Sequence, residues 1–159
     1  MTTLGAAAAV VVVIGLGIWG IFVLLGGGPV PADEARIEVA FTGDGTSFVG
    51  DREIVEGTVT VTFSNETDSD GILYVMAYET GSDALAVELE MIEVGGSLVT
   101  SDPPVAGYTE VLSDWPASPG THSYTVDMEA GNTYLFDAGF EDYHQSGIWR
   151  MAVIEVVAP

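Results

Sequence analysis

The feature that most constrains this chain is an uncharged apolar run near its N-terminus, Leu4–Leu25, which holds 22 residues. A bilayer core about 30 Å thick is crossed by about 20 apolar residues at helical rise. We therefore expect residues 1–28 to form a single transmembrane anchor. A cleaved signal peptide is the alternative, but Met1–Thr3 carries no basic side chain and the run is longer than the apolar core of such peptides.

The chain after this run has the length of one folded domain. The helix-breaking sequence Gly26–Pro31 predicts a short spacer, so we expect a linker over residues 29–35 and a domain over residues 36–159. Only a short tail precedes the anchor. We therefore expect a single-pass protein of the cell membrane with its domain on the extracytoplasmic side.

The charge balance excludes several classes of partner. The chain has 24 Asp and Glu against three Arg and no Lys, for a formal charge of −21. Such a surface repels phosphates, which excludes nucleic acid and disfavours anionic lipid headgroups. Two interpretations of the acidity stay open: a solvated surface suited to high salt, or a surface that attracts a basic partner or divalent cations. The chain has no Cys, which excludes disulfides and thiolate ligands.

Most of the domain has the patterning of β-strands. Over Thr58–Ser64, apolar Val and Phe alternate with Thr and Ser, as in a strand with one buried face. The nearly continuous apolar run Ile72–Tyr78 predicts a strand covered on both faces. Further strands are expected at Arg36–Phe41, His122–Met128, Thr133–Ala138 and Ile148–Val157. The turn Glu129–Asn132 is expected to pair the two strands around it as a hairpin.

One stretch has helical spacing. Leu85, Leu89 and Ile92 recur at i, i+4 and i+7, with Ser82 or Asp83 available as the N-cap, and the helix should end before Gly95. Ser97–Gly120 holds four prolines and little periodicity, which predicts a long irregular connection. Together these elements predict an all-β fold, a Greek-key sandwich of about seven strands with one short helix, preceded by one N-terminal transmembrane helix.

The order of elements resembles that of the cupredoxin family. Three segments carry the resemblance: a Val/Thr strand ending in Asn (Ile54–Asn65), a Gly-containing turn that enters a strand (Met128–Phe136), and a His followed by Gly before the last strand (His144–Ile148). The resemblance implies a cupredoxin-like β-sandwich. The loops Asn65–Gly71, hereafter the first acidic loop, and Gly139–Gly147, the second acidic loop, would then correspond to the family's metal-binding end.

The resemblance does not extend to the copper ligands. A blue-copper site needs two His and one Cys, usually with a weak axial Met. The corresponding positions hold Asp70–Ile72, Asp137–Ala138 and Ile148, and His144 alone stands near a ligand position. We therefore expect no redox copper and no other cofactor.

The second acidic loop and the strand before it supply the candidate metal ligands. Asp137, Glu141, Asp142 and His144 combine oxygen donors with one imidazole, a set that can hold Ca²⁺ or a borderline cation. The competing interpretation is a solvated acidic loop. No nucleophile motif such as G-x-S-x-G is present, and we expect no catalytic residues and no enzyme activity. Asn65-Glu66-Thr67 matches the N-glycosylation sequon.

These observations predict a membrane-anchored, cupredoxin-like binding domain without redox copper. It would serve as an accessory subunit that contacts a protein partner in a membrane complex. One alternative is a divalent-metal-binding or metal-delivery module that uses the His144 loop. Another is a structural protein of the cell envelope.

Overall fold

The computed structural model describes residues 28–42, 45–95, 98–99, 106–140 and 148–159. The apolar run that we expect to form the anchor lies outside these residues. No helix within the described part of the chain is long and apolar enough to cross a membrane.

The described residues form ten strands and one helix. In chain order these are β1 (Ile37–Phe41), β2 (Thr46–Gly50), β3 (Glu53–Val55), β4 (Gly57–Asn65), β5 (Gly71–Glu79), α1 (Asp83–Gly95), β6 (Leu98–Val99), β7 (Tyr108–Ala117), β8 (Gly120–Met128), β9 (Asn132–Phe140) and β10 (Ile148–Val157). The six expected strands are all present. The structure adds β2, β3, β6 and β7, which sequence analysis did not predict.

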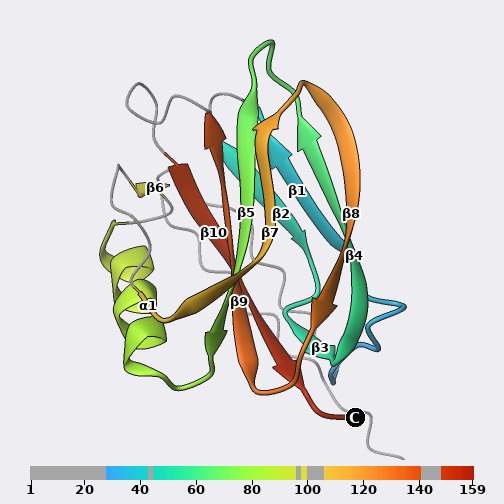
Figure 1. Cartoon of the computed structure of the whole chain (residues 1–159), viewed down its shortest axis with the longest axis vertical. Coiled ribbons are helices and arrows are strands. Elements are labelled where there is room, and N and C mark those ends of the chain that lie inside the picture. The colour runs from blue at the N-terminus through green and yellow to red at the C-terminus, as the bar shows by residue number, and fades with distance from the viewer. Residues whose placement is uncertain (1–27, 43–44, 96–97, 100–105, 141–147) are drawn as a thin grey trace, which may run out of the picture.

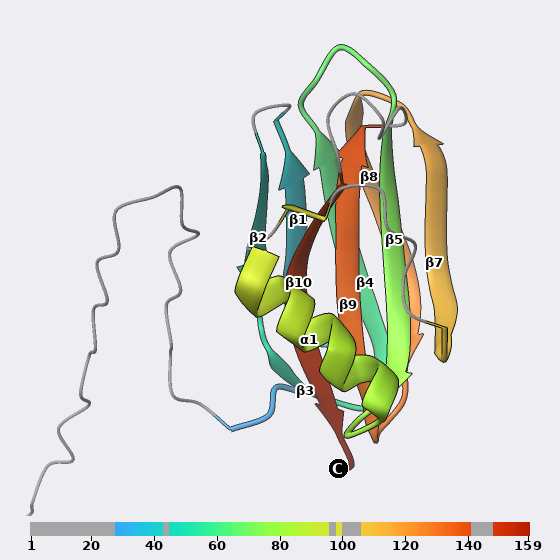
Figure 2. The same ribbon diagram turned by 90° about the vertical axis from the view of Figure 1, so that its left-hand side faces the viewer.

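The strands form two sheets that pack face to face (Figure 1). The smaller sheet has the order β2-β1-β4-β8, and the larger has the order β3-β10-β9-β5-β7 with β6 paired to β10. Two neighbouring pairs are parallel, β1 with β4 and β3 with β10. Helix α1 lies across the outer face of the larger sheet (Figure 2). The expected β-sandwich with one helix is therefore confirmed.

Alternating side chains build the core between the sheets. Val59, Val61 and Phe63 of β4 are completely buried, whereas Thr58 and Thr60, which alternate with them, are exposed, as predicted. Burial of such apolar surface supplies roughly 25 cal/mol per Å² and is the main stabilising contribution to a sandwich of this kind. Strand β5 is covered on both faces, also as predicted, because its outward-facing side chains form a second core with α1.

Helix α1 starts as predicted, and Leu85 and Ile92 of the predicted spacing pack toward the sheet. Ser82 Oγ accepts a hydrogen bond from the Leu85 backbone N–H at 3.3 Å, so Ser82 is the N-cap. Leu85 is buried, but Leu89 is 37% exposed and Glu88 is completely buried. The Tyr78 hydroxyl on β5 donates to Glu88 Oε1 at 3.2 Å, which satisfies a carboxylate inside the second core. The spacing that predicted the helix groups Leu89 with Leu85 and Ile92, but Leu89 is exposed in the structure.

Strand β7 occupies ten residues of the expected irregular connection Ser97–Gly120. It pairs with β5 along the edge of the larger sheet, with shifts in register at two places. Pro116 near its end follows Trp115 through a cis peptide bond. Proline is tolerated on an edge strand because the edge leaves backbone N–H groups unpaired. Pro116 was therefore misread as evidence against a strand.

The turn between β8 and β9 joins the two sheets and does not form the expected hairpin. Strand β8 pairs with β4, whereas β9 pairs with β5 and β10. The Gly131 N–H donates to the Val156 carbonyl at 3.1 Å, and the Thr80 N–H donates to the Gly131 carbonyl at 2.9 Å. These bonds attach the turn to the larger sheet. The apolar faces of β8 and β9 can then face each other across the core.

The described chain enters the sandwich at one end. Val30 forms a parallel bridge with Ile54, its N–H donates to the Glu53 carbonyl at 3.0 Å, and Ala32 is part of the main core. Residues of the expected linker therefore contact the domain directly. We call this end, which also holds the β8–β9 turn and the end of β10 at Val157, the anchor end.

Candidate functional site

Strand pairing brings the described residues that flank the two acidic loops to the opposite end of the sandwich, which we call the loop end. Gly71, where the first loop enters β5, pairs with Phe140 on β9. Ile148, which follows the second loop, pairs with Gly139. From the sequence, only the family resemblance placed these loops together; the strand register shows that the residues flanking them are neighbours. The first loop forms the tip of the molecule at the top of Figure 1.

A buried asparagine shapes the first acidic loop. Asn65 is 2% exposed, and its Nδ2 donates to the Ser69 carbonyl at 2.9 Å and to the Ala117 carbonyl at 3.0 Å. Its Oδ1 accepts from the Thr67 backbone N–H at 3.1 Å and from the Thr67 hydroxyl at 2.7 Å. Asn65 therefore fastens the loop to β7 and fixes its path. An Asn before a polar loop, with Thr two positions on, is the sequence signal of such an Asx turn.

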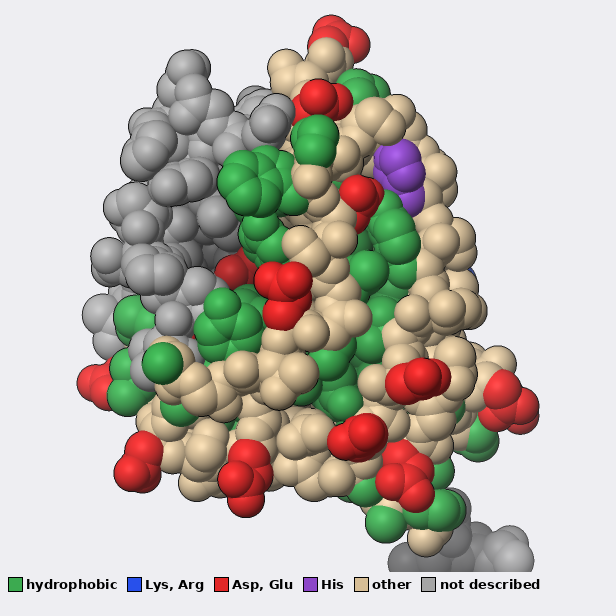
Figure 3. All heavy atoms as spheres, in the orientation of Figure 1, with side chains coloured by type: hydrophobic (Ala, Val, Ile, Leu, Met, Phe, Trp, Pro, Cys, Tyr) green, Lys and Arg blue, Asp and Glu red, His purple; other side chains and the backbone are tan. Residues whose placement is uncertain are grey.

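The loop held by Asn65 presents only acidic charge. Glu66, Asp68 and Asp70 are exposed, and no basic residue lies between Asn65 and Gly71. In Figure 3 acidic side chains stand at this tip and are scattered over the face that carries β7 and β8, with hydrophobic side chains between them. The described part of the loop end is thus an ordered acidic projection.

The structure places one of the four candidate metal ligands. Asp137 lies on β9, paired with Tyr74 of β5 and Arg150 of β10, and it is 3% exposed. It is a buried residue of the sheet, so the solvated-loop interpretation does not apply to it. Glu141, Asp142 and His144 lie outside the described residues, and the four-residue site stays a prediction. Within the described residues, no three His, Cys, Asp or Glu side chains are grouped to hold a metal ion.

The residues at this end do not fit a blue-copper centre. That centre requires a Cys thiolate, and the sequence contains no Cys. The strand position where the resemblance would place the thiolate is occupied by the buried carboxylate of Asp137. A single carboxylate among strand residues cannot replace the soft sulfur donor that such copper sites use.

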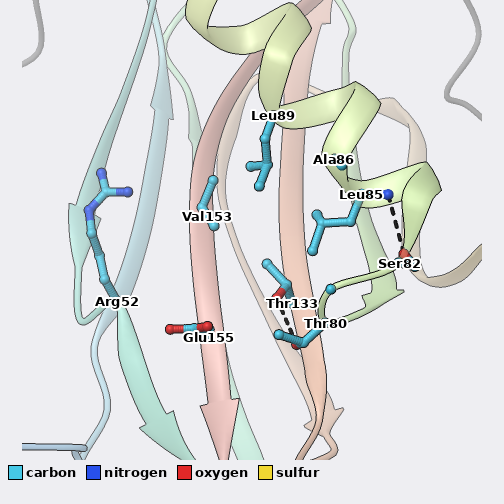
Figure 4. A pocket seen from close by; sticks show the side chains of 10 residues that line it. Arg52, Thr80, Ser82, Leu85, Ala86, Leu89, Thr133, Val153 and Glu155 are labelled. Carbon is cyan, nitrogen blue, oxygen red and sulfur yellow. Dashed lines mark hydrogen bonds between the residues drawn. The ribbon is translucent and has the colours of Figure 1, made fainter.

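A groove of about 510 Å³ lies at the other end of the larger sheet, beside α1. Leu85, Ala86 and Leu89 line it from the helix, and Val153 and Glu155 line it from β10. Figure 4 shows Leu85 and Leu89 extending from the helix toward Val153, with Arg52 on the opposite side. Sequence analysis did not find this groove, because its residues come from five separate segments that only the fold brings together.

The polar residues of the groove have defined contacts. The hydroxyls of Thr80 and Thr133 are hydrogen-bonded at 2.9 Å. The Arg52 guanidinium carbon lies 5.3 Å from the centre of the Phe48 ring, a cation–π distance. Burial lowers the pKa of Arg52 from its usual value, although an arginine keeps its charge at any physiological pH. The groove therefore combines an apolar wall with a partly desolvated cation.

A tyrosine and an aspartate connect the edges of the two sheets. The Tyr124 hydroxyl on β8 donates a hydrogen bond to the Asp114 carboxylate on β7. Burial, together with the hydrogen bond to Asp114 and the charge of Asp114, raises the pKa of Tyr124 well above its usual value. This phenol stays protonated under ordinary conditions, so we assign the pair a structural role in closing the sandwich edge.

No protein-family model matches the sequence, and no curated protein matches it. Solved structures similar to the chain include the dithionite-reduced auracyanin of the photosynthetic bacterium Roseiflexus castenholzii, at 23% identity over 84% of this chain and 100% of that one, with a TM-score of 0.42. They also include auracyanin A, a blue copper protein of the green thermophilic photosynthetic bacterium Chloroflexus aurantiacus, at 21% identity over 81% and 99% of the two chains, with a TM-score of 0.40. At these values the similarity supports no statement about ligands or function.

Proposed function

We propose that the chain is a membrane-anchored, extracytoplasmic, cupredoxin-like domain without redox copper that binds a basic protein partner through its loop end. It would act as an accessory subunit of a membrane complex and would not be an enzyme. The observation that carries the proposal is the opposition of the two ends. The described residues that follow the apolar run, from Gly28 on, join the sandwich at the anchor end, and the first acidic loop projects from the loop end.

Strand geometry gives the distance between the two ends. Strand β10 runs from the loop end, at Ile148, to the anchor end, at Val157, and its ten residues span about 30 Å at about 3.3 Å per residue. A domain attached at the anchor end would hold its acidic tip about that far from the bilayer. The tip would then be within reach of the exposed part of a neighbouring membrane subunit.

The charge and order of the tip support a protein partner with basic residues. Three exposed carboxylates lie within five residues of a chain whose formal charge is −21, which favours fast encounter with a basic surface. The Asn65 hydrogen bonds order the loop before binding, so little further entropy is lost on contact.

The proposal is tested by purifying the tagged full-length protein from its native membrane in mild detergent and identifying stoichiometric companions by mass spectrometry. The test variant combines Glu66→Gln, Asp68→Asn and Asp70→Asn. The matched control combines Glu53→Gln, Glu79→Gln and Glu129→Gln, which removes three exposed charges at the anchor end. We expect the wild type and the control to retain the partner. The loop variant should retain at most about a tenth, because the attraction is local to the tip.

Equal retention by all three proteins, or the absence of any stoichiometric companion, would contradict the proposal. Metal analysis of the same samples tests the first alternative. A lone protein that carries near-stoichiometric divalent metal would favour the metal-binding module. A lone protein without metal would favour the structural envelope protein.

A further inference from the structure

We propose that the groove beside α1 binds a zwitterionic membrane lipid, with its acyl chain along the apolar wall and its headgroup between Arg52 and Glu155. The inference rests on the proposed membrane anchoring, because that anchoring supplies the lipid. The volume of the groove, about 510 Å³, is within the range of about 300–1,000 Å³ that is usual for small-molecule sites.

The apolar wall explains the exposure of Leu89. Glu88 faces the sheet, where it accepts a hydrogen bond from Tyr78. Because Glu88 takes this buried position, the next residue, Leu89, is left 37% exposed at the groove. Leu89, Leu85 and Val153 converge from the helix and from β10 in Figure 4. An acyl chain laid between them would cover apolar surface that water now reaches, and this burial is favourable.

The polar side of the groove carries both signs of charge. The Glu155 backbone N–H donates to the Arg52 carbonyl at 2.8 Å, so these residues are held on adjacent segments. Both side chains line the groove. A guanidinium is well suited to a phosphate group, and a carboxylate to an ammonium group. A phosphoethanolamine headgroup presents both partners.

The location of the groove favours a lipid of the membrane to which the chain is attached. Thr80, at its lower rim, donates its backbone N–H to Gly131 in the β8–β9 turn. Arg52 directly precedes β3, which pairs with Val30 where the described chain begins. The groove is thus at the anchor end, close to the bilayer surface in the proposed orientation.

The overall charge favours a zwitterion over an anionic lipid. A formal charge of −21 repels an anionic headgroup on approach, and Glu155 would repel it in the groove. A headgroup without net charge experiences no such overall repulsion. The experiment can therefore separate the two headgroup classes by competition.

The test uses the full-length protein in micelles of an uncharged maltoside detergent, which supplies no zwitterionic headgroup, and lysophosphatidylethanolamine with a photoreactive diazirine in its acyl chain. After irradiation, a protease that cuts before Asp alone is used for mapping, because the chain has three Arg and no Lys and because residues 83–101 and 142–159 then form one peptide each. We expect adducts on the peptides that hold Leu85–Leu89 and Val153. Leu89→Asn and Arg52→Gln should each lower labelling at these peptides about tenfold.

The chain offers matched controls for both variants. Val87 is 44% exposed on the same helix but does not line the groove, so Val87→Asn should leave the labelling within about twofold of wild type. Arg36 is exposed and paired with Glu38, so Arg36→Gln should behave in the same way. Unlabelled lysophosphatidylethanolamine should compete, and lysophosphatidylglycerol should compete at least tenfold more weakly.

The proposed site would be overturned if the groove peptides were not labelled at all. It would also be overturned if Leu89→Asn and Val87→Asn gave equal labelling of these peptides. Equal competition by the two lysolipids would overturn the zwitterionic headgroup. Failure of the anchoring is seen separately, because the protein would then be extracted from membranes by alkaline carbonate. The labelling of that soluble full-length chain would still be lost in Leu89→Asn if the groove binds the lipid.

Discussion

At the residue scale, two buried polar side chains fix features that apolar patterning alone would leave open. Asn65 uses both Nδ2 hydrogens and its Oδ1 within the domain. Its amide is therefore buried and fully engaged, and the sequon that begins at Asn65 is inaccessible in the folded protein. Glu88 is likewise engaged, with Tyr78. Both residues act by satisfying neighbouring groups, which makes their removal costly.

Replacement of Asn65 should destabilise the domain. Asn65→Ala leaves the carbonyls of Ser69 and Ala117 and the N–H of Thr67 without this partner, and we expect a loss of about 2–4 kcal/mol in the free energy of unfolding. Urea unfolding followed by circular dichroism measures it. Thr60→Ala, an exposed change on the same strand, should cost less than about 1 kcal/mol. Similar losses in the two variants would show that Asn65 is not the fastening residue.

At the element scale, α1 shows how a polar contact contributes to the choice of the buried face of a helix. The helix lies on Met76, Tyr78 and Leu135 of the larger sheet. Leu85 enters this second core, and the next buried position one turn on is Glu88. The hydrogen bond from Tyr78 compensates part of the desolvation of the carboxylate. With Glu88 turned toward the sheet, Leu89 lies at the groove and forms part of its apolar wall.

Truncation of Glu88 should loosen this packing. Glu88→Ala removes buried contacts and the acceptor of the Tyr78 hydroxyl, so we expect the free energy of unfolding to fall by about 1–3 kcal/mol. Glu90→Ala, at an exposed position of the same helix, should change it by less than about 0.5 kcal/mol. Thermal and urea unfolding of the two variants provide the comparison. A neutral or stabilising Glu88→Ala would contradict a structural role for the buried carboxylate.

The outcome of sequence analysis differs between elements for physical reasons. Strands with one or two strongly apolar faces, such as β4 and β5, were predicted closely because burial determines their pattern. Strand β7 was missed because an edge strand tolerates proline and mixed exposure. The exposure of Leu89 was missed because the periodicity of a short helix does not reveal a hydrogen bond to another element. The groove residues could not be grouped before the fold was known.

At the scale of the whole molecule, the sandwich separates two surfaces with different chemistry. The loop end presents carboxylates on a loop fastened by buried hydrogen bonds. The anchor end receives the segment that follows the apolar run and holds the groove with its apolar wall. The length of β10 keeps these surfaces about 30 Å apart. Attachment to a membrane at one end would leave the acidic end free to contact a partner.

The most direct test of this account is the distance of each end from the bilayer. The chain lacks Cys, so Asp68→Cys at the loop end and Glu129→Cys at the anchor end can each carry a single fluorophore on the full-length protein. Energy transfer to an acceptor dye on nanodisc lipid headgroups then reports both distances. We predict strong transfer from position 129 and weak transfer from position 68, with distances that differ by about 20–30 Å. Equal transfer from the two positions, or failure of the protein to enter nanodiscs, would contradict the account.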